Sequence, residues 1–176
     1  YAAGVAIAGG VAVKVPLLEE NSFLPDLKAI PQDVARQAKM IWVNYPNNPT
    51  SAEANLGFYQ DLVDWARRYD VAVIADNPYS EICFDDFCPP SFLMADGARE
   101  VGIEFNSLSK AYNCCGWRIG MAVGNKEIIA AMMKVKSHSD RGIYYPIQVA
   151  ATAALNGPID FMEGRNKMFT ERRDVV

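Results

Sequence analysis

The chain has 176 residues, of which 51% are hydrophobic and 22% charged, with a formal net charge of −4 at pH 7. This composition is typical of a globular protein, and the length favours one domain with a sizeable core. The mild acidic balance, without a basic tract, argues against a nucleic-acid partner. The apolar stretch at residues 1–13 is shorter than the ~20 residues needed to cross a membrane, so no membrane partner is expected.

In chain order, the predicted strands and helices alternate. We expect a strand at Val11–Val15, then a helix at Asp26–Ala38, whose start Pro31 favours placing later. A strand at Met40–Asn44 and a helix at Glu53–Tyr69 come next, followed by strands at Val71–Asp76, Val101–Ser107 and Ile119–Val123. The chain continues with helices at Lys126–Ser137 and Pro146–Leu155 and a last helix from near Ile159.

This alternation predicts an α/β fold with three layers, α/β/α, and a mainly parallel sheet. The three middle strands are nearly continuous in apolar residues, as are strands covered on both faces. The strand Ile119–Val123 follows its neighbour too closely for a crossover helix, so it is expected to be the one antiparallel strand.

The cysteines do not suggest a metal site. Cys83, Cys88, Cys114 and Cys115 form no C-x-x-C pair, and His138 is the only histidine. A structural zinc site is therefore not expected. Adjacent cysteines rarely bridge each other, and we predict four reduced thiols in a cytoplasmic protein.

Polar side chains follow three of the predicted parallel strands. The carboxyl ends of such strands meet at one edge of a sheet, where ligands of open α/β sheets bind. Read singly, each of these residues is more simply a turn former, a helix cap or a solvated side chain. Together they form one set, namely Asn48, Asp76, Tyr79, Ser107, Ser109 and Lys110, with Arg118 just before the return strand.

A lysine at such an edge suits covalent chemistry on a carbonyl. Desolvation and nearby cations lower the pKa of a lysine enough to make it a nucleophile, and its common product is a Schiff base. If the carbonyl is that of pyridoxal phosphate, Asp76 can face the pyridine nitrogen. The phenolic oxygen then needs donors, which Asn48 and Tyr79 offer. Arg118 with Ser107, and also Ser109, would hold the phosphate.

Three stretches carry a resemblance to a known family: YPNNPT from residue 45, ADNPYSEI from residue 75 and SLSKAYNCCGWRIG from residue 107. In this order and spacing they resemble the fold-type I pyridoxal-phosphate aminotransferases of class I/II, over essentially the whole chain. The stretches DNPYSEICFDDFCPPSFL and KVKSHSDRGIYYPIQ are most similar to the LL-diaminopimelate aminotransferase branch.

The resemblance implies a role for each matching residue. Lys110 would bind the cofactor covalently and move a proton between the substrate α-carbon and the cofactor. Asp76 would be the partner of the pyridine nitrogen, and Tyr79 with Asn48 the pair on the phenolic oxygen. Ser107 and Arg118 would be phosphate ligands.

The implied reaction moves an amino group from an amino acid, LL-diaminopimelate or one like aspartate, to a 2-oxo acid such as 2-oxoglutarate. The implied protein is a cytoplasmic homodimer whose partners are these small molecules. Residues 1–157 would be part of the large, cofactor-binding domain, and residues 158–176 the start of a linker helix toward a small domain outside this chain. The isolated chain would then be inactive.

Two departures from the family pattern lie beside the lysine. Ala111 replaces a common threonine, and Cys114 with Cys115 replaces Met-Thr or Met-Pro. Neither removes a named role.

Other functions remain open at this stage. Ser107 and Lys110 spell S-x-x-K, the start of a Ser-Lys acyl-enzyme signature, but its partner motifs S-D-N and K-T-G are absent from the sequence. Lyases acting at the β-carbon, decarboxylases and acyl transferases of the same fold keep the same lysine and aspartate. A non-catalytic aminotransferase-like sensor domain is the third alternative.

Overall fold

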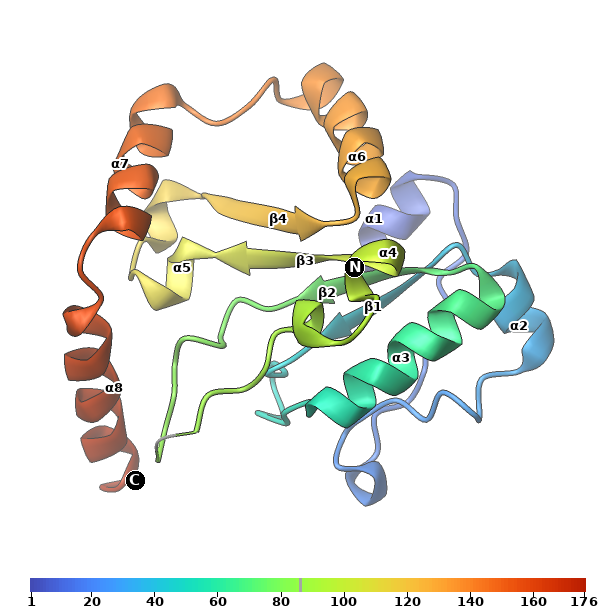
Figure 1. Cartoon of the computed structure of the whole chain (residues 1–176), viewed down its shortest axis with the longest axis horizontal. Coiled ribbons are helices and arrows are strands. Elements are labelled where there is room, and N and C mark those ends of the chain that lie inside the picture. Colours follow the sequence, from blue (N-terminus) through green and yellow to red (C-terminus); the bar gives the residue numbers. More distant parts are fainter. Residues whose placement is uncertain (86) are drawn as a thin grey trace.

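One mixed sheet organises the protein. The structure is a computed structural model that describes residues 1–85 and 87–176, so Asp86, within the motif beginning at Asp76, lies outside it. The strands are β1 (Met40–Asn44), β2 (Ala72–Asp76), β3 (Gly102–Ser107) and β4 (Gly120–Gly124), adjacent in that order. The first three are parallel and β4 is antiparallel to β3, as predicted (Figure 1).

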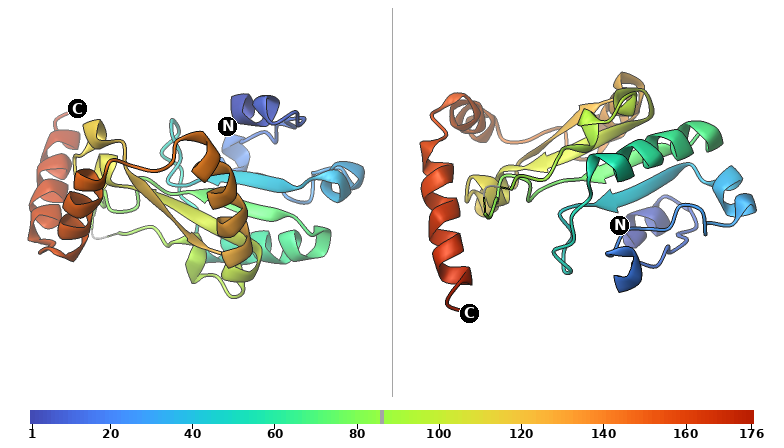
Figure 2. Two further views of the ribbon diagram at one scale, coloured as in Figure 1. Left: turned by 90° about the horizontal axis from the view of Figure 1, so that it is seen from above. Right: turned by 60° about the horizontal axis from the view of Figure 1, so that its bottom comes forward.

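Helices lie on the faces of the sheet and beyond one end of it. Figure 2 shows the sheet between α3 on one face and the N-terminal segment with α1 on the other, which confirms the expected layered α/β architecture. The helices are α1 (Ala2–Ile7), α2 (Gln32–Gln37), α3 (Leu56–Tyr69), α4 (Ala98–Val101), α5 (Leu108–Ala111), α6 (Lys126–Ser139), α7 (Tyr145–Asn156) and α8 (Asp160–Arg173), with short 3₁₀ turns η1 (Glu19–Asn21), η2 (Phe92–Met94) and η3 (Cys115–Trp117).

The core lies between α3 and the sheet. The helix begins after Asn55, whose side chain accepts a hydrogen bond from the backbone N–H of Phe58 at 2.8 Å, and it ends at Asp70 in the left-handed conformation. This cap places its start three residues later than predicted. Its apolar stripe packs on one face of β1 and β2, and the residues involved are Tyr59, Leu62, Val63, Ala66, Val43, Val73 and Ala75.

The later elements agree closely with the sequence. The Asn125 side chain accepts hydrogen bonds at the start of α6 as predicted, and α7 ends at Gly157. Figure 1 shows α7 and α8 beyond the carboxyl ends of the parallel strands, next to α5. Within the described part of the chain, no helix combines the length and the apolar character needed to cross a membrane.

The N-terminal predictions are partly wrong. Val11–Val15 forms no strand, and Val11 is 89% exposed. Alternating apolar residues make a strand only where a partner supplies ladder hydrogen bonds, and none pairs with this segment in the described residues. The helix predicted at Asp26–Ala38 is reduced to α2, because Pro31 is its N-cap and the Asp26 carboxylate closes a turn on the N–H of Lys28.

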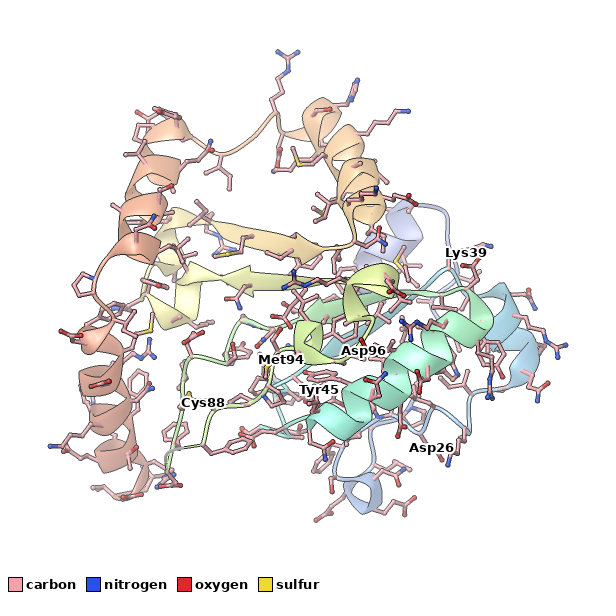
Figure 3. The ribbon with its side chains drawn as sticks, in the orientation of Figure 1. Asp26, Lys39, Tyr45, Cys88, Met94 and Asp96 are labelled. Carbon is pink, nitrogen blue, oxygen red and sulfur yellow. A yellow bond between two sulfur atoms is a disulfide. The ribbon has the colours of Figure 1, made fainter. Side chains whose placement is uncertain are left out.

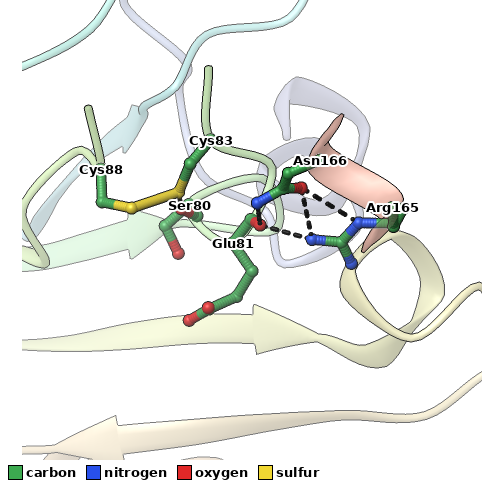
Figure 4. Close-up of a disulfide and its surroundings, with 6 residues drawn as sticks. All are labelled: Ser80, Glu81, Cys83, Cys88, Arg165 and Asn166. Carbon is green, nitrogen blue, oxygen red and sulfur yellow. Dashed lines mark hydrogen bonds between the residues drawn. A yellow bond between two sulfur atoms is a disulfide. The ribbon is translucent and has the colours of Figure 1, made fainter. Parts of the chain in front are cut away.

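The prediction of four reduced thiols is wrong for one pair. Cys83 and Cys88 form a disulfide with their Cα atoms 5.2 Å apart (Figure 4), and Figure 3 labels the position of Cys88 in the fold. Cys114 and Cys115 are free cysteines. The bridge lies in the loop that follows Tyr79, where Phe84 and Phe87 pair as an isolated antiparallel bridge. That pairing brings the two arms of the loop within reach of a disulfide.

The buried carboxylate of Glu104 connects β3 to the segment that begins η2. Glu104 of β3 is only 7% exposed, and its Oε2 accepts from the Ser91 hydroxyl and the Phe92 N–H, both at 2.8 Å. Its Oε1 accepts from the amide nitrogen of Asn77 at 3.1 Å. This network fixes the residue after Asp76 and the start of η2 against the central strand.

Glu104→Ala is expected to lower the free energy of unfolding by about 3 kcal/mol, because two buried donors and one partly buried donor lose their acceptor. Glu104→Gln should cost less, since the amide keeps one acceptor oxygen. Urea unfolding of the full-length protein measures both, with exposed Glu53→Ala as the control. Equal stability of Glu104→Ala and Glu53→Ala would contradict the assigned role of the network.

The buried Tyr45 gives the fold an alkaline pH dependence. Its hydroxyl donates to the Phe23 carbonyl at 2.6 Å, and burial raises the pKa of Tyr45 to about 12. Because the pKa is raised in the folded protein, the stabilisation is complete below the ordinary value near 10 and is lost between pH 10 and about 12.

Tyr45→Phe should therefore cost about 1 kcal/mol of stability at pH 7, the value of one hydrogen bond. Above pH 10 the wild-type advantage should shrink by roughly 1.4 kcal/mol per pH unit, because only the wild type carries this titration. Urea unfolding at pH 7, 10 and 11 tests this, with Tyr144→Phe, 73% exposed, as the control. A constant difference across that range would refute the prediction.

Candidate active site

The sheet brings the predicted residues to one edge. In the parallel register Asn44 of β1 pairs with Asp76, and Asp76 with Phe105, so β1, β2 and β3 end side by side. Ser107, the last residue of β3, pairs with Gly120 of β4. The loops after β1 and β2 carry Asn48 and Tyr79, α5 after β3 carries Ser109 and Lys110, and Arg118 comes just before β4.

Asp76 lies on the sheet face opposite α3. Its carboxylate accepts a hydrogen bond from the Tyr1 hydroxyl, and the Tyr1 ring stacks on Trp42 with centroids 4.6 Å apart. Trp42 in turn stacks with Phe105 at 6.2 Å. Burial, with the Asp76 carboxylate as a further cause, raises the pKa of Tyr1. The stacking of the Tyr1 ring on Trp42 therefore holds the Tyr1 hydroxyl in position to donate to Asp76.

The side chains of Asn48 and Tyr79 contact each other. The amide nitrogen of Asn48 donates to the Tyr79 hydroxyl at 3.3 Å, although the two residues come from loops after different strands. Asn44 supports this arrangement from the end of β1. Its Oδ1 accepts from the Asn48 N–H at 3.0 Å, and its Nδ2 donates to the Asp76 carbonyl at 2.9 Å.

Lys110 lies in α5, directly beyond β3. The Ser107 hydroxyl caps this short helix by accepting from the Ser109 N–H at 3.1 Å, and buried Leu108 and Ala111 anchor it. The Lys110 side chain is exposed, and its Nζ is 6.0 Å from the centroid of the Tyr79 ring. The amine and the phenol therefore share one region of the surface.

Arg118 occupies a turn in the left-handed conformation, with φ of 52°. Its guanidinium donates to the Cys115 carbonyl at 2.9 Å. Ser107, the N-cap of α5, pairs with Gly120 of β4, and Arg118 comes two residues before Gly120 in the chain. The backbone thus brings Arg118 near the end of β3, and a planar cation of this kind suits a phosphate.

The sequence profile of the family described as "Aminotransferase class I and II" matches residues 1–176. The chain belongs to this family. The class I and II aminotransferases use pyridoxal phosphate, which fits the chemistry of the residues at this sheet edge.

Individual aminotransferases are similar over the whole chain. The LL-diaminopimelate aminotransferase of Aquifex aeolicus is 53% identical over 176 residues, and that of Halothermothrix orenii is 50% identical over 176 residues. Both alignments cover 100% of this chain, and they cover 46% and 45% of those proteins, respectively. The chain therefore spans about half the length of these curated relatives.

A solved structure gives the same picture. That of a probable N-succinyldiaminopimelate aminotransferase from Thermus thermophilus superposes with a TM-score of 0.89 at 36% identity. The superposition covers 97% of this chain and 45% of that one.

The site of this aminotransferase chain fits the family cofactor on its own geometry. Asp76 already accepts a hydrogen bond from a phenol, and a protonated pyridine nitrogen offers a donor of the same kind. Asn48 and Tyr79 place two polar groups side by side for an oxygen acceptor. Lys110 lies near the same phenol. Nothing in this donor set conflicts with the group.

Sequence reasoning missed three residues that contact the candidate site. Asn44 is a polar residue at the carboxyl end of a parallel strand, so the criterion that identified Asp76 could also have identified Asn44. Tyr1 lies 75 residues from Asp76, and no local pattern links them. Arg165 of α8 donates to the Ala111 carbonyl, which is 54 residues away in the sequence, and nothing in the sequence around Arg165 indicated this contact.

Proposed function

We propose that this chain is the central part of the cofactor-binding domain of a pyridoxal-phosphate-dependent aminotransferase. The observation that carries the proposal is that Lys110 and Asp76 come to one sheet edge together with the hydrogen-bonded pair Asn48 and Tyr79. A nucleophilic amine, a carboxylate and two neutral donors are what the chemistry of this cofactor requires.

In this proposal each side chain has a distinct task. When bound, the cofactor supplies a conjugated ring that draws electrons from the substrate α-carbon. The Lys110 amine would bond to the carbonyl carbon with loss of water and, once the amine of the substrate has displaced it, would carry a proton to and from that α-carbon. The Asp76 carboxylate keeps a proton on the ring nitrogen, and Tyr79 with Asn48 donates to the phenolic oxygen.

The other end of the site holds the phosphate in this proposal. Arg118 is the planar cation, and the Ser107 and Ser109 hydroxyls are the neutral donors. Fixing the phosphate orients the ring, so that the substrate α-carbon is presented to Lys110 rather than to water.

The substrate proposed is LL-diaminopimelate, with an amino acid like aspartate as the nearest variant and 2-oxoglutarate as the acceptor. Relatives at 53% and 50% identity carry the name LL-diaminopimelate aminotransferase, and an aspartate aminotransferase from Thermus thermophilus is a structural neighbour with a TM-score of 0.85 at 32% identity.

Steady-state kinetics of the full-length protein test the activity. We expect glutamate to form from LL-diaminopimelate and 2-oxoglutarate, with kcat/KM at least ~10-fold above that for aspartate. Release of ammonia with a 2-oxo acid, without an acceptor, would instead identify a β-lyase. Failure of added pyridoxal phosphate to produce a visible absorption band would overturn the proposal altogether.

Domain organisation and assembly belong to the same proposal. Residues 1–157 would be part of the large domain, and residues 158–176 the start of a helix toward a small domain. Exposed apolar residues on α6 and α7, among them Met133, Tyr145 and Val149, support burial of these helices against further chain or a second subunit. Homodimerisation of the full-length protein is the arrangement we propose, and sedimentation equilibrium tests it.

We further propose that residues 1–176 alone bind the cofactor weakly and do not transaminate. Robust turnover by the purified segment would refute this. A cytoplasmic location of the full-length protein is proposed with it. Cell fractionation followed by immunoblotting tests this location, and recovery of the protein in the secreted or membrane fraction would contradict it.

A further inference from the structure

Arg165 of α8 contacts both the end of α5 and the loop after Tyr79. One of its terminal nitrogens donates to the Ala111 carbonyl, and the other donates to the Glu81 carbonyl. Figure 4 shows the second contact and its support from Asn166. The Asn166 side chain accepts from Nε of Arg165 at 3.2 Å and donates to the same Glu81 carbonyl at 3.2 Å. The Asn166 side chain and the two carbonyls thus fix the orientation of the Arg165 guanidinium.

The two carbonyls belong to the segments that carry the proposed reacting groups. Ala111 directly follows Lys110 at the end of α5, and Glu81 is two residues after Tyr79. Lys110 and Tyr79 come from loops after different strands. Backbone hydrogen bonds between the two segments extend only as far as Asn77 and Phe105, so the Arg165 contacts are further links between them beyond the sheet.

Arginine is suited to this task. Its donors lie in one rigid plane, so two acceptors bound to them are held at a set separation. Arg165 is half-buried, and desolvation lowers its pKa, with the Glu81 carboxylate and Tyr112 acting in the opposite direction. Hydrogen bonds from a cation in such surroundings are stronger than those on the open surface.

We propose that Arg165 is a positioning residue of the active site, which sets the distance between the Lys110 amine and the Tyr79 hydroxyl by clamping Ala111 and Glu81. This inference rests on the function proposed above, since it assigns Arg165 a role toward those two groups. Arg165 touches neither a substrate nor the reacting atoms. Its effect reaches them through the backbone of α5 and of the loop after Tyr79.

Three variants of the full-length protein separate the possible roles. Arg165→Met removes both contacts, and Arg165→Lys keeps the charge but can satisfy one carbonyl at a time. Arg173→Met is the matched control. Arg173 lies on the same helix and pairs with Asp85 of the same loop at 2.7 Å, so its loss loosens the contact between α8 and the loop without touching Ala111.

The first readout is amide hydrogen exchange of the cofactor-free protein. The Ile82 N–H bonds to the Tyr79 carbonyl, and the Tyr112 N–H to the Leu108 carbonyl, so these amides report on the two clamped segments. Arg165→Met should speed exchange at both amides. Arg173→Met should speed it only at Ile82. This measurement does not depend on activity, so it stands even if the proposed reaction is wrong.

The second readout uses the protein with pyridoxal phosphate bound. The pH midpoint of the visible absorption band should move by about half a unit or more in Arg165→Met, because the Tyr79 hydroxyl would no longer be held in place to donate to the phenolic oxygen of the cofactor. We expect kcat to fall about 10- to 100-fold with little change in KM, and Arg165→Lys to lie between it and the wild type.

Three results would overturn the inference. One is exchange at Tyr112 unchanged in Arg165→Met. Another is a pH midpoint that stays at the wild-type value. The third is the same midpoint shift and kcat loss in Arg173→Met, which would mean that general docking of α8 matters rather than the clamp. Retention of the band in Lys110→Ala would instead count against the proposed function, so the two failures are distinguishable.

Discussion

Lys110→Ala in the full-length protein is expected to abolish the visible absorption band of bound pyridoxal phosphate and to lower kcat by at least ~10³-fold. The physical reason is that the Lys110 amine is assigned both the covalent bond to the cofactor carbonyl and the transfer of the α-proton. Its place 6.0 Å from the Tyr79 ring puts it beside the other proposed cofactor ligands. Absorbance titration and steady-state kinetics measure the two effects.

Lys126→Ala is the control for this change. Lys126 is an exposed lysine in the first turn of α6, and its loss should leave both the band and kcat near the wild-type values. A band of normal position and strength in Lys110→Ala would move the covalent role to another residue. Mass spectrometry after borohydride reduction, which fixes the bond, would then locate it.

Asp76→Asn should leave the cofactor attached but lower kcat by about 10²- to 10³-fold, in the range found for removing one preorganised electrostatic partner. The amide carries no charge to keep a proton on the ring nitrogen, so the ring draws electrons less strongly. Attachment persists because Lys110 is intact. The amide oxygen can also still accept from Tyr1, so the local structure should be preserved.

Asp70→Asn is the matched control for Asp76→Asn. Asp70 ends α3 in the left-handed conformation, which asparagine also adopts readily, and its side chain is exposed. Pre-steady-state absorbance of both variants separates loss of the chemical step from loss of binding. An Asp76→Asn protein with wild-type kcat would show that the carboxylate does not act on the ring.

The buried strands were the most predictable part of the fold. Nearly continuous apolar runs located β1 to the residue and β2 and β3 to within one residue at their starts. Such runs are diagnostic when helices cover both faces, because no polar residue then has to alternate with them. Val11–Val15 has a similar pattern but no partner strand in the described residues, so the strand predicted there from its composition is absent.

Contacts between distant segments were the least predictable part of the site. Asp76 ends a strand, and Asn48 and Lys110 each follow one, so topology alone brings these residues to one edge of the sheet, and the sequence was sufficient for that. The disulfide depended on how the loop after Tyr79 folds back on itself, and the Arg165 clamp on where α8 packs. Neither is encoded in a spacing or a periodicity, so only the structure reveals them.

The strand order has a consequence for assembly on the ribosome. Each strand in the described sheet pairs with its nearest strand along the chain, so the order in space is the order of synthesis. At about 5–20 residues per second, β2 emerges a few seconds after β1 and can join it before β3 exists. The nascent sheet thus grows at one open edge, and none of these four strands has to insert between two that are already paired.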